Sequence, residues 1–170
     1  MPINFPNSPS VNQTYTFGGR TWKWNGVGWQ VFNATLLPEI GTNTVAQTFT
    51  LAAGATTLLS YELSPLVQIY NVDVTATNSS AKAWIRVYLN STGAAADANR
   101  SISDDPLNTS GVVTEIITAI SPQSVNLAPI ATAVNGESPR SSAYPVRVTN
   151  TSTVAATFTI TINYVFLTIN

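Results

Sequence analysis

The chain has 170 residues, enough for one domain or for one domain with a small appendage. Charged residues make up 9% of the sequence, against about 25% in typical domains, and the net charge is −1. The basic residues are scattered, which disfavours nucleic-acid binding through phosphates. The lack of cysteine and histidine excludes disulfides, thiolate or imidazole metal sites and the common catalytic triads.

Threonine, serine, asparagine, alanine and valine fill the place of the missing charges, which is typical of strands joined by turns. The N-terminus lacks the basic and apolar regions of a signal peptide. No run approaches the roughly 20 apolar residues of a membrane span. We therefore expect an entire gene product without a leader, made in a cytoplasm and not embedded in a membrane.

The first predicted elements are three short strands near the N-terminus. Alternating residues run over Thr14–Phe17, Thr21–Trp24 and Trp29–Phe32, and the intervening turns carry Gly18-Gly19 and Asn25-Gly26. Alternation broken by such pairs predicts a three-stranded antiparallel meander. Three of the four tryptophans in the chain, Trp22, Trp24 and Trp29, lie within it.

This tryptophan cluster has two interpretations. Exposed indoles could stack on sugars, which would make the meander a receptor-binding module. Indoles packed on one another would instead form the core of a sheet that has few other large apolar residues. We favour the second interpretation, with Arg20 close to the indoles as a cation–π or turn-locking group.

A connector from Asn33 to Thr44, interrupted by Pro38 and Gly41, separates the meander from the rest of the chain. Further strands are then predicted, because apolar and polar residues alternate between turn signals. Their ranges are Gln47–Ala52, Thr56–Glu62, Tyr70–Thr77, Lys82–Asn90, Val112–Ile120, Ser124–Ile130, Ala143–Asn150 and Ala156–Ile169. Two segments, residues 72–89 and 146–164, share a strand–turn–strand pattern and are predicted to be two hairpins.

Long loops are predicted at Ser91–Gly111, with one helical turn over Ala94–Asn99, and at Thr132–Ser142. The first contains Asp97, Asp104 and Asp105, whose oxygens could hold Ca²⁺, but their spacing matches no calcium motif. We expect Asp97 to form a local ion pair with Arg100 instead. No cofactor or metal is expected, and the dispersed carboxylates argue against an enzyme.

The last strand is the longest and becomes apolar on both faces near its end. Tyr164 and Phe166 lie on one face, whereas Val165, Leu167 and Ile169 lie on the other. Since a sandwich has one interior, we expect another copy of the chain to cover the second face.

The fold class expected from these elements is all-β. Residues 1–36 would form the N-terminal arm and meander, residues 37–45 a linker, and residues 46–170 an antiparallel β-sandwich of jelly-roll or immunoglobulin-like type.

The N-terminal segment also contains a pattern of the form FPxxPxxxxxYxFxGRxWxWNGxxW, from Phe5 to Trp29. It resembles the opening module of virion proteins from tailed bacteriophages, especially phages of cyanobacteria. The body is more loosely similar to β-sandwich domains that follow this module. That second similarity rests on the closing strand and on Arg86, Tyr88, Ala96, Asp97, Arg100, Gly111, Glu115, Arg147 and Asn150.

The resemblance implies a virion structural protein on the outside of a phage particle. The leading hypothesis is a capsid decoration, or cement, subunit that associates as a homotrimer and binds the major capsid protein or another virion protein. The alternative is a tail-fibre or tail-tip module that binds a host receptor glycan.

Overall fold

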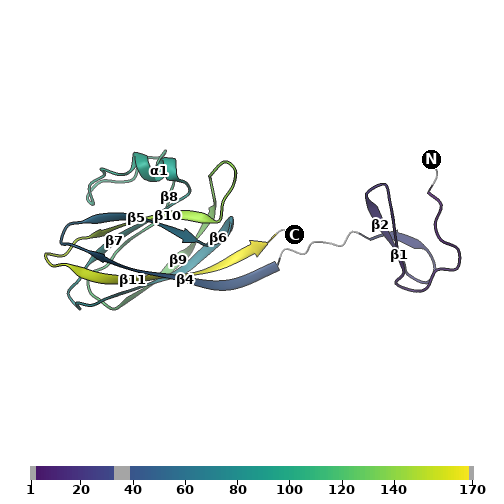
Figure 1. Ribbon diagram of the computed structural model, residues 1–170, viewed down its shortest axis with the longest axis horizontal. Coiled ribbons are helices and arrows are strands. Elements are labelled where there is room, and N and C mark those ends of the chain that lie inside the picture. The colour runs from purple at the N-terminus through teal and green to yellow at the C-terminus, as the bar shows by residue number, and fades with distance from the viewer. Residues whose placement is uncertain (1–2, 33–38, 169–170) are drawn as a thin grey trace. The chain divides into compact units, whose positions relative to one another are not determined.

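The structure is a computed structural model that describes residues 3–32 and 39–168. The chain divides into two compact units, one ending at Glu39 and one spanning Ile40–Thr168 (Figure 1). The N-terminal unit contains the strands β1 (Thr14–Phe17), β2 (Arg20–Trp24) and β3 (Trp29–Val31). The body contains β4 (Glu39–Leu51), β5 (Thr56–Glu62), β6 (Leu66–Ala76), β7 (Ala83–Tyr88), α1 (Ser91–Ala96), β8 (Val112–Ile117), β9 (Gln123–Val134), β10 (Ala143–Asn150) and β11 (Ala156–Thr168).

The N-terminal unit is the predicted meander. Its strands pair antiparallel in the order β1-β2-β3. Gly18 and Gly19 both adopt positive φ in the first turn, a conformation that other residues rarely tolerate. In the second turn, Asn25 accepts hydrogen bonds from the amides of Val27 and Gly28 through its side-chain oxygen.

The body is an antiparallel sandwich of two four-stranded sheets with the orders β4-β11-β6-β9 and β5-β10-β7-β8. Counted from the first body strand to the eighth, these orders read 1-8-3-6 and 2-7-4-5. This is the arrangement of a jelly roll, in which two Greek keys wrap around one core. The expected all-β fold is therefore confirmed, and the strand order decides between the two sandwich types in favour of the jelly roll.

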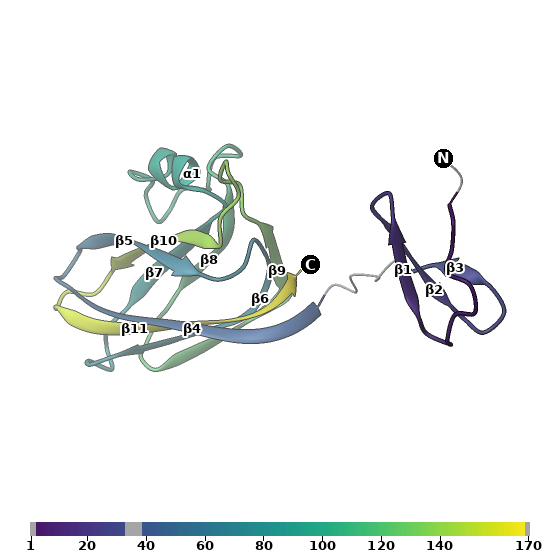
Figure 2. The same ribbon diagram turned by 45° about the vertical axis from the view of Figure 1, so that its right-hand side comes forward.

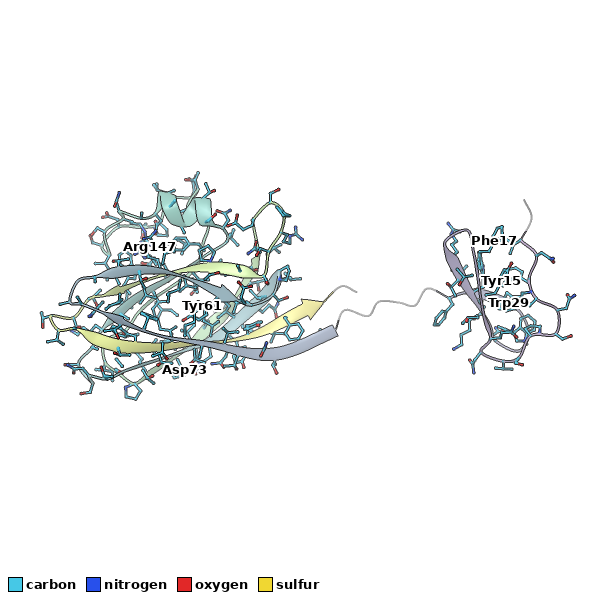
Figure 3. All side chains as sticks on the ribbon, in the orientation of Figure 1. Tyr15, Phe17, Trp29, Tyr61, Asp73 and Arg147 are labelled. Carbon is cyan, nitrogen blue, oxygen red and sulfur yellow. The ribbon has the colours of Figure 1, made fainter. Side chains whose placement is uncertain are left out.

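Alternating residues of both sheets fill the core between them. Phe158, Ile160 and Ile162 of β11 point inward, whereas the intervening threonines lie on the outer face. Tyr61 is fully buried between the sheets and donates a hydrogen bond to the carbonyl of Ile160 at 3.1 Å (Figure 3). Buried tyrosines thus add cross-sheet hydrogen bonds to apolar packing.

The outer face of the β4-β11-β6-β9 sheet is polar. Asn163 of β11 lies at its centre, where it accepts a hydrogen bond from Thr44 at 2.8 Å and donates to Asn71 and Asp73 at 2.7 and 2.9 Å. Asn71 in turn donates to Ser124 of β9 at 2.8 Å. A row of hydroxyl and amide groups therefore crosses all four strands.

The helix α1 and the loop that follows it lie on the outer side of the other sheet (Figures 1 and 2). They cover β7, all six residues of which are buried. Ala83, Ile85 and Val87 belong to the core, so Trp84, Arg86 and Tyr88 point to the opposite face of this strand. Residues 91–111, which were predicted to be a loop, therefore form a cover segment over the outer face of β7.

Two predictions about strand pairing were wrong. The segments containing β6–β7 and β10–β11 were expected to be hairpins, but each connects a strand of one sheet to a strand of the other. Their turns are built alike, since the side chains of Asn78 and Asn150 accept hydrogen bonds from the amides of Ser80 and Ser152. Such a turn sets the local direction of the chain and does not decide which strand becomes the hydrogen-bonded neighbour.

Several boundaries also differ from the prediction. β6 begins at Leu66 and not at Tyr70, and β8 ends at Ile117 and not at Ile120. β4 begins at Glu39, although Gly41 was expected to interrupt the chain. A Cβ atom at Gly41 would lie 2.5 Å from the ring of Phe166, so the glycine leaves room for that ring and the strand continues. β9 extends to Val134, and α1 begins at Ser91, where the side chain of Asn90 caps it through the amide of Gly93.

Candidate functional site

The tryptophans of the N-terminal unit lie on one face of the meander together with Tyr15. Trp22 is buried, and Trp24 and Trp29 are half-buried with ring centroids 5.7 Å apart. Phe5, from the segment before β1, stacks on Trp29 at 5.2 Å and meets Trp22 edge-on at 5.5 Å. The N-terminal arm therefore covers Trp22 and Trp29.

Phe5 completes this cluster, because it also contacts Tyr15 edge-on at a centroid distance of 5.6 Å. Sequence reasoning assigned no packing role to Phe5. The sequence signal for Phe5 was its place at the start of the FPxxP pattern. Because this segment lies outside any strand, alternation of apolar and polar residues could not indicate that Phe5 is packed. Figure 3 shows Tyr15 and Trp29 in this unit.

Arg20 does not make the expected cation–π contact with the indoles in the described part of the chain. It is exposed at the start of β2, opposite Phe17, and the cation–π contacts within the described residues involve other side chains. In the meander it is Lys23 that lies over an aromatic ring, that of Phe32, at 5.3 Å. Arg20 is paired with Phe17 beside the turn between β1 and β2, and its side chain is exposed to solvent.

The meander also carries a pocket of about 230 Å³. Its lining includes Lys23 and Gln30, which are cross-strand partners, and the ring of Phe32. Amide, ammonium and aromatic groups are the kinds of side chain that hold neutral polar ligands such as sugars. Trp24 also lines this pocket, so the pocket adjoins the indole cluster.

A buried network of charges joins the cover segment to the body. Asp97 accepts hydrogen bonds from Arg100 at 2.7 Å, from Tyr88 at 2.7 Å and from Arg86 at 3.3 Å. Asp97 and Arg86 are both 1% exposed. Glu115 of β8 completes the network by accepting from Arg100 at 3.0 Å. The expected ion pair between Asp97 and Arg100 is present, and it belongs to a larger cluster.

An aromatic ring and a third arginine extend this network. The guanidinium of Arg86 lies 3.6 Å from the ring centroid of Trp84, and the Trp84 indole N–H donates to Glu115. Arg147 of β10 donates to the carbonyl of Ala94 in α1 at 2.9 Å (Figure 3). These contacts attach α1 and its loop to three neighbouring strands.

Burial and hydrogen bonding shift the ionisation of this cluster in opposite directions. Burial alone would raise the pKa of Asp97, but hydrogen bonds from Arg100 and Tyr88 and the charges of both arginines outweigh it and lower the pKa. Burial and the bond to Asp97 raise the pKa of Tyr88 to about 12. Asp97 therefore remains a carboxylate, and Tyr88 remains a hydrogen-bond donor.

The three loop aspartates do not converge. Asp97 is enclosed by arginines, whereas Asp104 and Asp105 are exposed and Asp104 offers Arg100 its backbone carbonyl at 2.6 Å. Within residues 3–32 and 39–168, no three acidic side chains are grouped as metal ligands would be. The positive charges around Asp97 would repel a cation, so the arrangement suits a structural role for this carboxylate.

The end of β11 is the remaining candidate surface. Tyr164 is buried and donates to the carbonyl of Leu63 at 3.2 Å, and Phe166 packs at the margin of the core. Val165 is half-buried and lines an apolar pocket of about 230 Å³ with Leu66 and Phe166. Ile169 and the side chain of Leu167 lie outside the described residues.

No helix in the described ranges is both long and apolar enough to cross a membrane.

No protein-family model and no curated protein matches the chain. Among solved structures, it is similar to the VP2 subviral particle of infectious bursal disease virus, with a TM-score of 0.22 and 10% identity over 98% of this chain and 50% of that one. A structure of the Gt strain of the same virus gives a TM-score of 0.21 and 10% identity over 99% and 51%. The chain thus spans about half the length of these structures. At such TM-scores the similarity carries no argument about fold or function.

Proposed function

We propose that this protein is a non-catalytic structural component of a bacteriophage particle, and specifically a decoration subunit on the outside of the capsid. The observation that carries the proposal is the packing of Phe5 on two of the three clustered indoles. In the phage-like N-terminal module, Phe5 packs on Trp22 and Trp29 and so occupies the surface that these two indoles would offer to a sugar. A module whose aromatic residues are used for its own packing is suited to scaffolding rather than to ligand capture.

The body supports the same proposal by its architecture and surface. Jelly rolls occur in viral capsid and lectin domains among others, so the fold permits the function without establishing it. The body has few charged side chains, and four of them, Arg86, Asp97, Arg100 and Glu115, pair with one another in the buried network. The remaining surface of hydroxyls and amides is suited to repeated contacts with neighbouring subunits.

The partners proposed for this role are the major capsid protein or another virion protein. Decoration would stabilise the shell because many weak contacts act together on a symmetric lattice. A homotrimer through the end of β11 is expected from the resemblance, and the apolar pocket beside Val165 offers one surface for it.

The direct test locates this subunit by cryo-electron microscopy on particles of the virus that encodes it. We expect density on the capsid exterior. Particles stripped of the protein should release their genome at a lower temperature, and adding back the purified protein should restore the original value. Density confined to the tail would overturn the decoration role.

The second candidate function is recognition of a host glycan by the tail. The observation that favours it is the pocket of the meander, where Lys23, Trp24 and Phe32 line one cavity. Binding of the purified protein to a glycan array, lost in Phe32→Ala and retained in Phe17→Ala, would support it. Absence of binding would exclude this pocket as a receptor site.

A further inference from the structure

The strand β4 has an unusually unprotected edge. It pairs with β11 and stands at the border of its sheet. From Ile40 to Leu51 it carries neither a charged residue nor a proline. Such an edge presents unpaired amides and carbonyls to any other strand, and natural proteins usually block it.

The other border strands of the sandwich have such protection. β9 contains Pro129 and a shift of register, β8 has six residues and carries Glu115, and β5 has seven residues and ends at Glu62. β4 is longer, with 13 residues, and has none of these features after Glu39. The contrast within one domain indicates that the β4 edge is used for pairing.

The outward-facing side chains of β4 read the same in both directions. They are Thr42, Thr44, Ala46, Thr48 and Thr50, and all five are exposed. If two copies pair antiparallel about Ala46, each Ala46 meets its counterpart, Thr44 meets Thr48, and Thr42 meets Thr50. The strand is therefore complementary to itself, as a two-fold contact requires.

Cross-strand threonine pairs already recur in this protein. The hydroxyls of Thr48 and Thr159 are 2.8 Å apart, as are those of Thr50 and Thr157. Directly opposed threonines of this kind stabilise antiparallel sheets. Pairing at the β4 edge would repeat the same contact between two chains.

The hydroxyl groups also have the right bonding capacity. Thr44 donates its proton to Asn163, so its oxygen can still accept. Either hydroxyl can donate in the pair of Thr48 and Thr159. When Thr159 donates, the proton of Thr48 is available for Thr44 of the second copy. The polar row then continues from one sheet into the other through Thr44 and Thr48.

We propose that two copies of this chain associate along β4, antiparallel about a two-fold axis at Ala46, and form one continuous eight-stranded sheet. No charge on the strand from Ile40 onward opposes their approach. The contact is a property of the protein in solution and does not depend on the proposed role in a virion. It is also distinct from the surface beside Val165.

Cysteine cross-linking tests the register. The chain has no cysteine, so Ala46→Cys introduces the only thiol. Opposed residues in an antiparallel pair have Cα atoms about 4.5–5.5 Å apart, within the range that a disulfide spans. Under mild oxidation Ala46→Cys should convert to a covalent dimer. Thr75→Cys, exposed on the same face but on the internal strand β6, should remain largely monomeric. Equal cross-linking of both variants would overturn the register.

Charge substitution tests the association itself. The wild type should sediment as a dimer, or as a multiple of two, at about 100 μM. Ala46→Lys and Ala46→Glu should each lose the dimer while keeping the wild-type circular dichroism. An equimolar mixture of the two variants should recover the dimer, because the ammonium group of one chain then faces the carboxylate of the other. Thr75→Lys should leave the mass unchanged. A monomeric wild type, an odd-numbered assembly without a dimer, or single variants that still dimerise would overturn the proposal.

Discussion

Single residues hold each unit of this protein together at points where the chain leaves its strands. In the N-terminal unit this residue is Phe5, which contacts Tyr15, Trp22 and Trp29 at once. In the body it is Asp97, which lies in a loop and binds groups from both the loop and β7. Both act through side chains that the regular alternation of strands does not reveal.

Replacing Phe5 with alanine should destabilise the N-terminal unit. Aromatic pairs contribute about 0.5–1.5 kcal/mol each beyond area burial, so the loss of three pairs should cost about 2–4 kcal/mol. Denaturant titration followed by tryptophan fluorescence measures it, since three of the four tryptophans lie in this unit. Phe17→Ala is the matched control, because Phe17 is 40% exposed. An equal effect of both variants would contradict a special role for Phe5.

Asp97→Asn should leave the buried Arg86 without its carboxylate partner, whereas Arg100 keeps Glu115. Breaking a buried ion pair by removing one partner costs about 3–5 kcal/mol, whereas Asp104→Asn at an exposed site should change stability by less than about 0.5 kcal/mol. Urea unfolding measures both, and hydrogen exchange should show faster opening of residues 91–111. Unchanged exchange in this segment would contradict the role of Asp97 in attaching it.

The lowered pKa of Asp97 also predicts how the stability of the body changes in acid. The pKa of Asp97 is lower in the folded state than in the unfolded chain, so its contribution is present above about pH 4 and is lost as the pH falls further. Below that pH, the free energy of unfolding should therefore fall less steeply in Asp97→Asn than in the wild type. A wild type and variant with parallel acid titrations would show that Asp97 is not the responsible group.

At the scale of elements, the length of β4 depends on one close contact between strands. Gly41 accommodates the ring of Phe166, which lies where a side chain at position 41 would stand. The absence of a side chain thus extends the strand instead of interrupting it. The border strand proposed to join two copies consequently remains regular toward its beginning.

Gly41→Ala should lower the stability of the body by about 1–3 kcal/mol, as is typical of overpacking. Gly28→Ala is a suitable control, because a Cβ atom there would have no neighbour within 4 Å. Thermal unfolding measures both variants. Combining Gly41→Ala with Phe166→Leu should restore part of the lost stability. If it does not, the destabilisation by Gly41→Ala does not come from the clash with the Phe166 ring.

At the scale of the whole molecule, the jelly roll is held together by tyrosines as well as by aliphatic residues. Tyr144 donates across the sandwich to the carbonyl of Pro65 at 3.1 Å, and burial raises its pKa to about 12. Tyr88 has a pKa raised to the same value beneath the cover segment. Tyr61, whose pKa burial also raises, lies between the two sheets.

These tyrosines predict how the protein responds to alkali. Their stabilising contribution is complete below the unfolded pKa of about 10 and declines as the pH approaches the folded value of about 12. The decline should be at most about 1.4 kcal/mol per pH unit for each tyrosine. Urea midpoints between pH 8 and 12 measure it, and Tyr144→Phe should reduce the slope. A flat profile up to pH 12 would contradict the prediction.

The sequence by itself determined the elements whose cause is local. Alternation and turn residues predicted the meander, the full range of Thr56–Glu62 and the inward face of β11. The pair of Asp97 and Arg100 was also predictable, because the two residues are three positions apart.

Only the tertiary structure decided which strands are neighbours and which side chains close each core. Within the body, β7 and β8 are the consecutive strands that pair with each other, and the remaining connections cross between the sheets. A turn such as that at Asn150 has the same local geometry in a hairpin and in a crossing connection. The burial of whole strand faces selects between the two, and that burial depends on residues far apart in the chain, as do the contacts of Phe5 and Gly41.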